Sequence, residues 1–345
     1  MTIDNNKSGF LTHVSLLRVV AMMTVIMYHS LCYFVVWSHP VTAPAFKAGP
    51  EPWLTLLAHF LTRTNMPTFV FLSGFLYAHL RIEAGKYRDT GRFVWGKVKR
   101  LLIPYLFWSL ALIVCFPLSH HNFTKILFGF CHLWFLLMLF EEALLFHFTA
   151  RWWQKWPRWA DWLALLLLMV LQYHFRGLHL SAHEPLMLLK PLVINIPYYA
   201  LGIACQKCMS QWHRAPWPVF ALLAVESGIM VAVLLGGLRM WRAGFFYVLS
   251  VLTFVVSLFF LFRAFCQGRP GLASNKLLHD LDRCSMGIYI IHHIFIEAMT
   301  HIDVVRLWLN AHYYLGPLLL FCCALAVGWT VTHFMLKTRL RVLFG

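Results

Sequence analysis

Ten long and nearly continuous apolar segments occupy most of this 345-residue chain. A hydrocarbon layer of ~30 Å requires about 20 apolar residues per helix, and only helices or closed barrels satisfy their backbone polar groups there. Barrel strands alternate apolar and polar residues, whereas these runs do not alternate. The sequence therefore predicts an all-α, polytopic membrane helix bundle of about ten transmembrane helices. The predicted segments are Val14–Trp37, Met66–Leu80, Leu101–Leu118, Lys125–Thr149, Trp159–Phe175, Met187–Cys208, Trp217–Gly236, Gly244–Phe265, Cys284–Met299 and Leu315–Leu336.

The composition agrees with this fold class. Only 12% of the residues are charged, about half the share in an average soluble domain. No soluble domain, internal repeat or low-complexity linker separates the segments, so residues 1–345 are expected to form a single membrane-embedded domain. Residues 51–64 carry Trp53, Leu54, Leu57, Phe60 and Leu61 on one helical face, which predicts an interfacial helix before the second span.

The distribution of Lys and Arg among the loops predicts the orientation. Of the 29 basic residues, 21 lie at the two ends and in alternate connections, including a basic loop at 81–100. The positive-inside rule places this set in the cytoplasm, together with both termini. The net charge of +16 is then mainly a topology signal, and nucleic-acid binding is not expected.

Two ionisable residues lie on one face of the first segment. Arg18 and His29 are eleven residues apart, which is three helical turns plus ~20°. An Arg near the cytoplasmic surface suits a phosphate, and a His at depth suits general acid or base work. The structural alternative is an Arg whose head reaches the interface and a His bonded to a neighbouring helix.

Further polar groups occur in the second to fourth segments. Ser73 and Gly74 fit either a site or close helix packing. Lys97, Lys99 and Arg100 fit either membrane anchoring or a phosphate-bearing cytoplasmic ligand. In the fourth segment, at least one of two adjacent acids should point into the bundle; these acids are Glu141 and Glu142, and Glu226 of the seventh segment is a similar group.

The ninth segment places Ser285, Tyr289 and His292 on one helical stripe, at positions i, i+4 and i+7. Three polar groups on one stripe of a membrane helix indicate a buried network or a lined cavity. The chain has no GxxxxGKS loop, no HExxH zinc motif and no GxSxG nucleophile elbow, and we expect no metal.

Taken together, these residues resemble the acyltransferase-3 family of bacterial membrane acyltransferases, which modify glycans. The resemblance covers residues 15 to 293 and rests on five motifs in the expected order. The motifs are Arg18-Val-Val-Ala21 with His29, Asn65-Met-Pro67 with Phe71-Leu-Ser73-Gly-Phe75, Lys97 with Arg100 and Pro104, His132-Leu-Trp-Phe135, and Ser285-Met-Gly-Ile-Tyr289-Ile-Ile-His292. Ser15 is a departure, because many members carry an acidic residue three positions before the Arg, and the group that orients Arg18 is left open.

The resemblance implies a multi-pass protein of the bacterial cytoplasmic (inner) membrane. Members take an acyl group, usually acetyl, from cytoplasmic acyl-CoA and deliver it to a hydroxyl of a sugar. Arg18 and His29 would be the essential pair of the first helix, and Ser73, Gly74 and Arg100 would belong to the other motifs. The expected partners are the lipid bilayer, acyl-CoA and a glycan or lipid-linked sugar; the acyl group could also be succinyl.

The residues and the resemblance suggest one mechanism. Arg18, Lys97, Lys99 and Arg100 hold the phosphates of CoA, and His29 acts as general base on the acceptor hydroxyl. Ser73, Tyr289 and His292 are candidate donors to the oxyanion. A covalent acyl-histidine is a second route. Two other classes of protein stay open, namely a proton-coupled transporter or flippase of a lipid-linked saccharide, and a non-catalytic scaffold.

Overall fold

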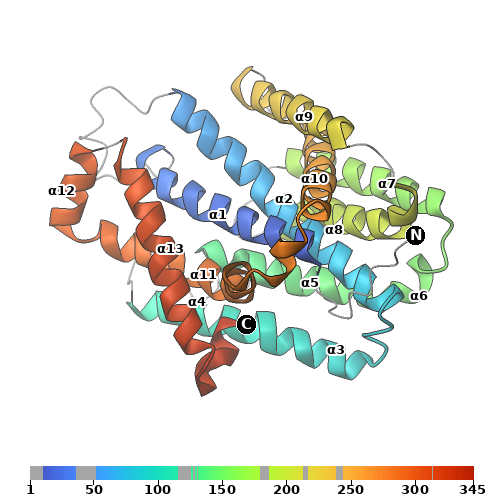
Figure 1. Cartoon of the computed structure of the whole chain (residues 1–345), viewed down its shortest axis with the longest axis horizontal. Helices are drawn as coiled ribbons and strands as arrows, with labels where there is room; N and C mark the ends of the chain where they lie inside the picture. Colours follow the sequence, from blue (N-terminus) through green and yellow to red (C-terminus); the bar gives the residue numbers. More distant parts are fainter. Residues whose placement is uncertain are drawn as a thin grey trace.

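A computed structural model describes residues 11–35, 52–115, 126, 129, 131–178, 186–212, 217–237, 244–312 and 314–345. Over these residues the protein is all-helical, as the sequence predicts, with no β-strand (Figure 1). Over the described residues, each of the ten predicted segments overlaps a helix. The helices are α1 (Thr12–Val35), α2 (Pro52–Ile82), α3 (Thr90–Lys97), the π-helix η1 (Val98–Leu102), α4 (Ile103–Cys115), the 3₁₀-helix η3 (Cys131–Leu133), α5 (Trp134–Phe148), α6 (Ala150–Trp153), α7 (Arg158–Gly177), α8 (Leu186–Trp212), α9 (Trp217–Gly237), α10 (Gly244–Gln267), η4 (Pro270–Ser274), α11 (Lys276–Thr300), α12 (Asp303–Ala311), α13 (Gly316–Met335) and η5 (Arg339–Phe344).

Five helical stretches among the described residues are long and apolar enough to cross a membrane by length and composition, and a sixth is added if α11 and α12, bent by 92°, count as one span. The five are Thr12–Val35, Cys131–Phe148, Leu186–Met209, Gly244–Gln267 and Gly316–Met335. The chain is therefore a multi-pass membrane protein by this criterion. Ten spans and cytoplasmic termini stay predictions, and residues 1–10 lie outside the described part of the chain.

Helix α1 forms the centre of the bundle. It packs against α2, α10, α11 and α13, and most of its apolar side chains are buried (Figure 1). The outer faces of other helices remain apolar and exposed. On α9, for example, the exposed side chains Leu222, Val225, Ile229 and Val233 form one stripe, as expected for a surface that faces lipid.

Glycines bring two of these helices into backbone contact. A Cβ atom added at Gly74 of α2 would lie 2.1 Å from the carbonyl oxygen of Tyr199 in α8. A Cβ atom added at Gly202 of α8 would lie 2.2 Å from the carbonyl oxygen of Phe71. The Ser73-Gly74 pair therefore does allow close packing, through Gly74.

The structure corrects two predicted boundaries. The predicted interfacial helix and the second segment form one helix, because α2 runs without a break from Pro52 through Pro67 to Ile82, and the interfacial position of its first part stays a prediction. Within it, Thr64 and Thr68 donate their hydroxyls to carbonyls one turn earlier, and such internal bonding makes these polar residues tolerable in a membrane helix.

The basic segment 81–100 is likewise not a loop over its whole length. Asp89 caps α3 by accepting a hydrogen bond of 3.1 Å from the backbone N–H of Arg92. From there α3, η1 and α4 continue as one rod, drawn along the lower edge of Figure 1. Hydropathy alone misses α3 because five of its eight residues are polar or glycine.

Candidate functional site

A cavity of about 190 Å³, here called the central cavity, lies among α1, α2, α3, η1, α5 and α11. Its wall contains both apolar and polar side chains. The polar lining residues are Arg18, Ser73, Tyr77, Tyr87, Lys97, Arg100, Ser285 and Tyr289. The cavity thus collects residues from segments that are far apart in the sequence.

Arg18 is held in place by a carboxylate from α11. One guanidinium nitrogen, Nη1, lies 3.0 Å from Oδ1 of Asp282, and the hydroxyl of Ser15 donates to Oδ2 of the same carboxylate at 2.8 Å. Asp282 therefore orients Arg18, with Ser15 completing the arrangement from one turn before it on α1. The guanidinium thus lines the cavity in a fixed orientation, with donors left over for a ligand, while the carboxylate of Asp282 offsets its charge.

Two further cations enter the cavity from the α3–η1 segment. Pro104 has no N–H to offer the carbonyl of Arg100, and next to it the helix widens into a π-turn in which the N–H of Ile103 bonds the carbonyl of Val98. Lys97 and Arg100 both line the cavity. Burial, with help from the charge of Arg100, lowers the pKa of Lys97 to about 8.

Hydroxyl groups of Ser73, Ser285 and Tyr289 also line the central cavity. Ser73 donates to the carbonyl of Phe69 at 2.9 Å, and Tyr289 donates to the carbonyl of His132. Ser285 lies one turn before Tyr289 on the same face of α11. Both bonded hydroxyls use their protons on backbone carbonyls in this structure, so either one would have to turn in order to donate to a substrate oxyanion.

Four histidines, His29, His132, His292 and His293, form a histidine cluster next to Tyr289. The ring of Tyr289 lies 5.8 Å from the rings of both His132 and His292. His132 stacks on His293 with a centroid separation of 4.3 Å and an interplanar angle of 11°. The Nε2 atom of His132 lies 3.1 Å from the carbonyl of Ile290, and this contact joins η3 to α11.

Backbone carbonyls fix the tautomers of the central pair. Nδ1 of His29 lies 3.1 Å from the carbonyl oxygen of Val25, and Nδ1 of His292 lies 3.1 Å from that of Ile288. A carbonyl only accepts, so both Nδ1 atoms carry the proton. Nε2 of His292 then accepts from Nδ1–H of His29, also at 3.1 Å, and His29 keeps its lone pair on Nε2. This is the form that a general base needs.

The structure brings most of the predicted site residues together. Five of them line the central cavity, namely Arg18, Ser73, Lys97, Arg100 and Tyr289. His29 and His292 are buried next to the cavity in the histidine cluster, and neither belongs to its lining. Lys99 lies apart, because its ammonium sits 5.1 Å from the centre of the Trp95 ring and its side chain does not line the cavity.

Sequence reasoning missed Asp282, Tyr77 and Tyr87. A signal for Asp282 was present, since it lies three residues before Ser285 and extends the same helical stripe. The ninth segment was predicted to begin at Cys284, whereas α11 begins at Lys276 after the capping residue Asn275, which accepts from the N–H of Leu278 at 3.0 Å.

The acids of the fourth and seventh segments differ in their surroundings. Glu142 points into the bundle as expected and is fully buried, but neither carboxylate oxygen has a hydrogen-bond partner among the described residues. Glu226 is exposed on α9, so its expected burial is wrong.

One group among the described residues has metal-ligand types, namely Asp280, Cys284 and His333. Oδ2 of Asp280 already accepts from Trp329 at 2.7 Å and from Nδ1 of His333 at 2.8 Å, and Oδ1 accepts from Arg283 at 2.7 Å. We interpret this group as a hydrogen-bonded contact between α11 and α13, because the His333 nitrogen that faces it carries a proton.

Comparison with known protein families identifies a match over nearly the whole chain. The model of an acyltransferase domain family, acyltransferase-3, matches residues 12–333, nearly the whole chain. No curated protein and no solved structure shows significant similarity to it.

Proposed function

Because this chain belongs to the acyltransferase-3 family, we propose that it transfers an acyl group, expected to be acetyl, from cytoplasmic acyl-CoA to a hydroxyl of a glycan or a lipid-linked sugar. One observation carries the proposal beyond the family. A single cavity has Arg18, Lys97 and Arg100 in its wall and also reaches Tyr289, whose ring contacts the histidine cluster. One extended ligand in this cavity would therefore have its phosphates beside the basic groups and its other end beside Tyr289 and the histidine cluster.

The volume of the cavity favours a narrow ligand. Pockets for drug-sized molecules measure about 300–1,000 Å³, and the central cavity is smaller, at about 190 Å³. Such a space suits the thin pantetheine arm of CoA and a small acyl group. The phosphates would stay at the basic end, where guanidinium and ammonium groups bind them through charge-assisted hydrogen bonds.

The chemical step uses the tautomer of His29 described above. Nε2 of His29 accepts the proton of the acceptor hydroxyl while the oxygen of that hydroxyl attacks the thioester carbonyl. The carbon–sulfur bond of the tetrahedral intermediate then breaks, and the proton held by His29 is returned to the departing thiolate. His292, whose two ring nitrogens are both engaged, orients His29 and stabilises its charged form, a role that fits its contacts better than donation to the oxyanion.

The test is a transfer assay on protein purified in detergent. Acetyl-CoA and membrane-derived glycan are supplied, and the released CoA thiol and the labelled glycan are both measured. The His29→Ala variant should lose at least about 100-fold in kcat, the usual contribution of a positioned base. His301→Ala, an exposed position at the end of α11, is the control. Wild-type transfer by His29→Ala would refute the assignment, and label on the protein with acyl-CoA alone would favour the acyl-histidine route.

Glu142 favours a second candidate function. A buried carboxyl without a partner inside a membrane protein is typical of proton-coupled carriers. The same assay separates the two functions, because group transfer proceeds in detergent whereas transport requires two compartments. A sealed-vesicle assay that shows uptake of a lipid-linked saccharide, lost in Glu142→Gln, would favour the transporter.

A further inference from the structure

A second, wider cavity lies on the other side of the α2–α3 connection. It measures about 950 Å³ and is called the basic cavity here. Five basic side chains and one acidic side chain line it. The basic ones are Arg81, Arg88, Arg158, Lys207 and Arg263, and the acidic one is Glu83. These residues come from α2, the α2–α3 connection, α7, α8 and α10, so the cavity is built by the tertiary fold.

The charges of this cavity are unbalanced. Lys207 is neutralised by Asp161, whose carboxylate oxygen lies 2.6 Å from its ammonium. Glu83 is engaged by His79 at 2.9 Å and by the amide of Gln206. By contrast, none of the four arginines has a carboxylate of the described residues within 4.0 Å. Four guanidinium groups therefore face one cavity without an ion-pair partner, and Glu83, which acts on Arg263 from beyond 4.0 Å, is the one acidic group in the lining.

Two inner arginines are held in position. Nη1 of Arg81 donates to the carbonyl of Tyr87 at 2.7 Å, while its Nε is a buried donor that no described residue accepts from. Arg263 is half-buried, and among the described residues the hydrogen-bond acceptor of its Nη1 is the weakly accepting sulfur of Met209. Buried polar groups are normally satisfied, so donors left over in a cavity indicate a missing acceptor.

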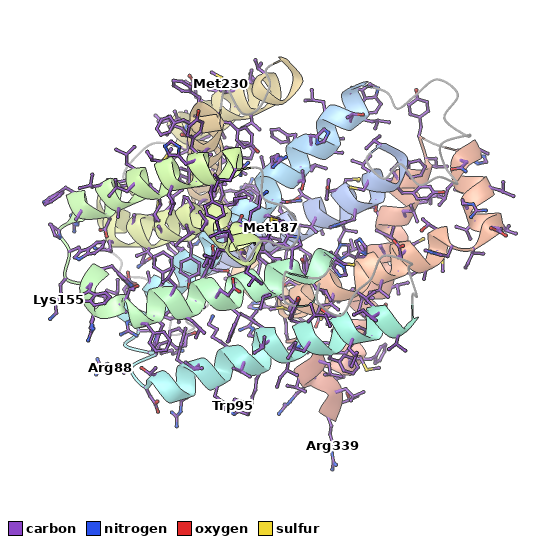
Figure 2. All side chains as sticks on the ribbon, turned by 180° about the vertical axis from the view of Figure 1, so that it is seen from behind. Arg88, Trp95, Lys155, Met187, Met230 and Arg339 are labelled. Carbon is purple, nitrogen blue, oxygen red and sulfur yellow. The ribbon has the colours of Figure 1, made fainter. Side chains whose placement is uncertain are left out.

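We propose that the basic cavity is a binding site for a phosphate-bearing ligand, distinct from the donor site in the central cavity. Arg81 and Arg263 form its inner part, and the exposed Arg88 and Arg158 form its rim. Arginine forks match the oxygen geometry of phosphate, and four of them suit more than one phosphate group. Figure 2 shows Arg88 at the same end of the molecule as Lys155, which is the end predicted to face the cytoplasm. Two sources share this chemistry, namely an anionic lipid headgroup and a soluble polyphosphate.

The experiment changes the rim, where substitutions leave the bundle intact. The double variant Arg88→Gln/Arg158→Gln is compared with Arg92→Gln/Arg151→Gln, which removes the same charge from exposed positions of neighbouring segments outside the cavity. One arm measures binding of inorganic pyrophosphate to protein in phosphatidylcholine nanodiscs. The other uses native mass spectrometry to count phosphatidylglycerol molecules retained from mixed phosphatidylglycerol–phosphatidylcholine micelles.

The rim variant should weaken binding at least about tenfold in one arm, and the control variant should stay within about twofold. Loss in the pyrophosphate arm identifies a soluble ligand, and loss in the phosphatidylglycerol arm identifies a lipid headgroup. If wild type binds neither probe, or if the rim and control variants behave alike in both arms, the proposal is overturned. Arg263→Gln, compared in the same two arms, gives a second reading from the inner part of the site.

Discussion

The Nδ1 atom of His29 and the Nε2 atom of His292 lie 3.1 Å apart, although 263 positions separate the two residues in the chain. Each ring is also fixed by a carbonyl one turn earlier on its own helix. These three contacts leave one arrangement of protons, in which His292 is the acceptor and His29 the donor. The pair therefore places the lone pair of His29 on Nε2, and a charged His29 would be stabilised by His292.

Variants of His292 should distinguish its role in orienting His29 from its role in packing. His292→Phe keeps an aromatic ring but removes the acceptor, and kcat should fall about 10- to 100-fold, equivalent to a lost hydrogen bond to a charged group of about 1.5–3 kcal/mol. His292→Gln can still accept from Nδ1–H of His29 and should retain most of kcat. KM for acyl-CoA should stay constant in both variants. Equal losses in the two variants would show that the position matters for packing alone.

The Arg18–Asp282 pair predicts a strong energetic coupling. Arg18→Gln removes a charge from the central cavity, and Asp282→Asn frees the guanidinium from its 3.0 Å contact. Each single change should raise KM for acyl-CoA, and the double variant should be no worse than Arg18→Gln, because Asp282 acts through Arg18. The four proteins of this cycle are compared by initial rates. If the increases in KM caused by the two single changes added fully in the double variant, the positioning role of Asp282 would be contradicted.

Lys97 predicts a pH dependence of donor binding. Burial lowers its pKa to about 8, so the side chain is charged below pH 8 and loses this charge as the pH rises through that value. KM for acyl-CoA should therefore increase between about pH 7 and 9, where the charged fraction falls to about one tenth. Lys97→Arg should flatten this profile, because a guanidinium stays charged. Lys99→Arg is the control, since Lys99 stacks on Trp95 outside the cavity. An unchanged profile in Lys97→Arg would contradict the assignment.

Long apolar runs predict helices well, because the membrane leaves few other solutions for the backbone. All ten predicted segments overlap helices in the described part of the chain, and the stripe of Ser285, Tyr289 and His292 does face a cavity and a buried cluster. Helical periodicity alone also places Arg18 and His29 on one face. These features depend on local spacing, which can be read directly from the sequence.

The missed features depend on polar helical ends and on tertiary contacts. Asp282 lies in the charged first turns of α11, which a hydropathy window excludes from the segment. Lys99 is two positions after Lys97, about 200° around a helix, so the two side chains reach different surroundings, which a segment taken as a loop does not predict. The pairing of His29 with His292 requires α1 and α11 to be neighbours, which no local pattern predicts.

Gly74 should be necessary for the contact between α2 and α8. In Gly74→Ala the new Cβ would meet the carbonyl oxygen of Tyr199 at 2.1 Å, and a backbone atom of a packed helix has little room to move away. We expect a destabilisation of about 1–3 kcal/mol, measured as a lower midpoint of thermal unfolding in detergent. Gly96→Ala is the matched control, because no atom lies within 4 Å of its added Cβ and alanine is a better helix former by about 1 kcal/mol. Gly74→Ala should also lose activity, since the neighbouring Ser73 lines the central cavity and would move with α2. If Gly74→Ala is as stable as Gly96→Ala, the close approach of these helices does not contribute to the fold.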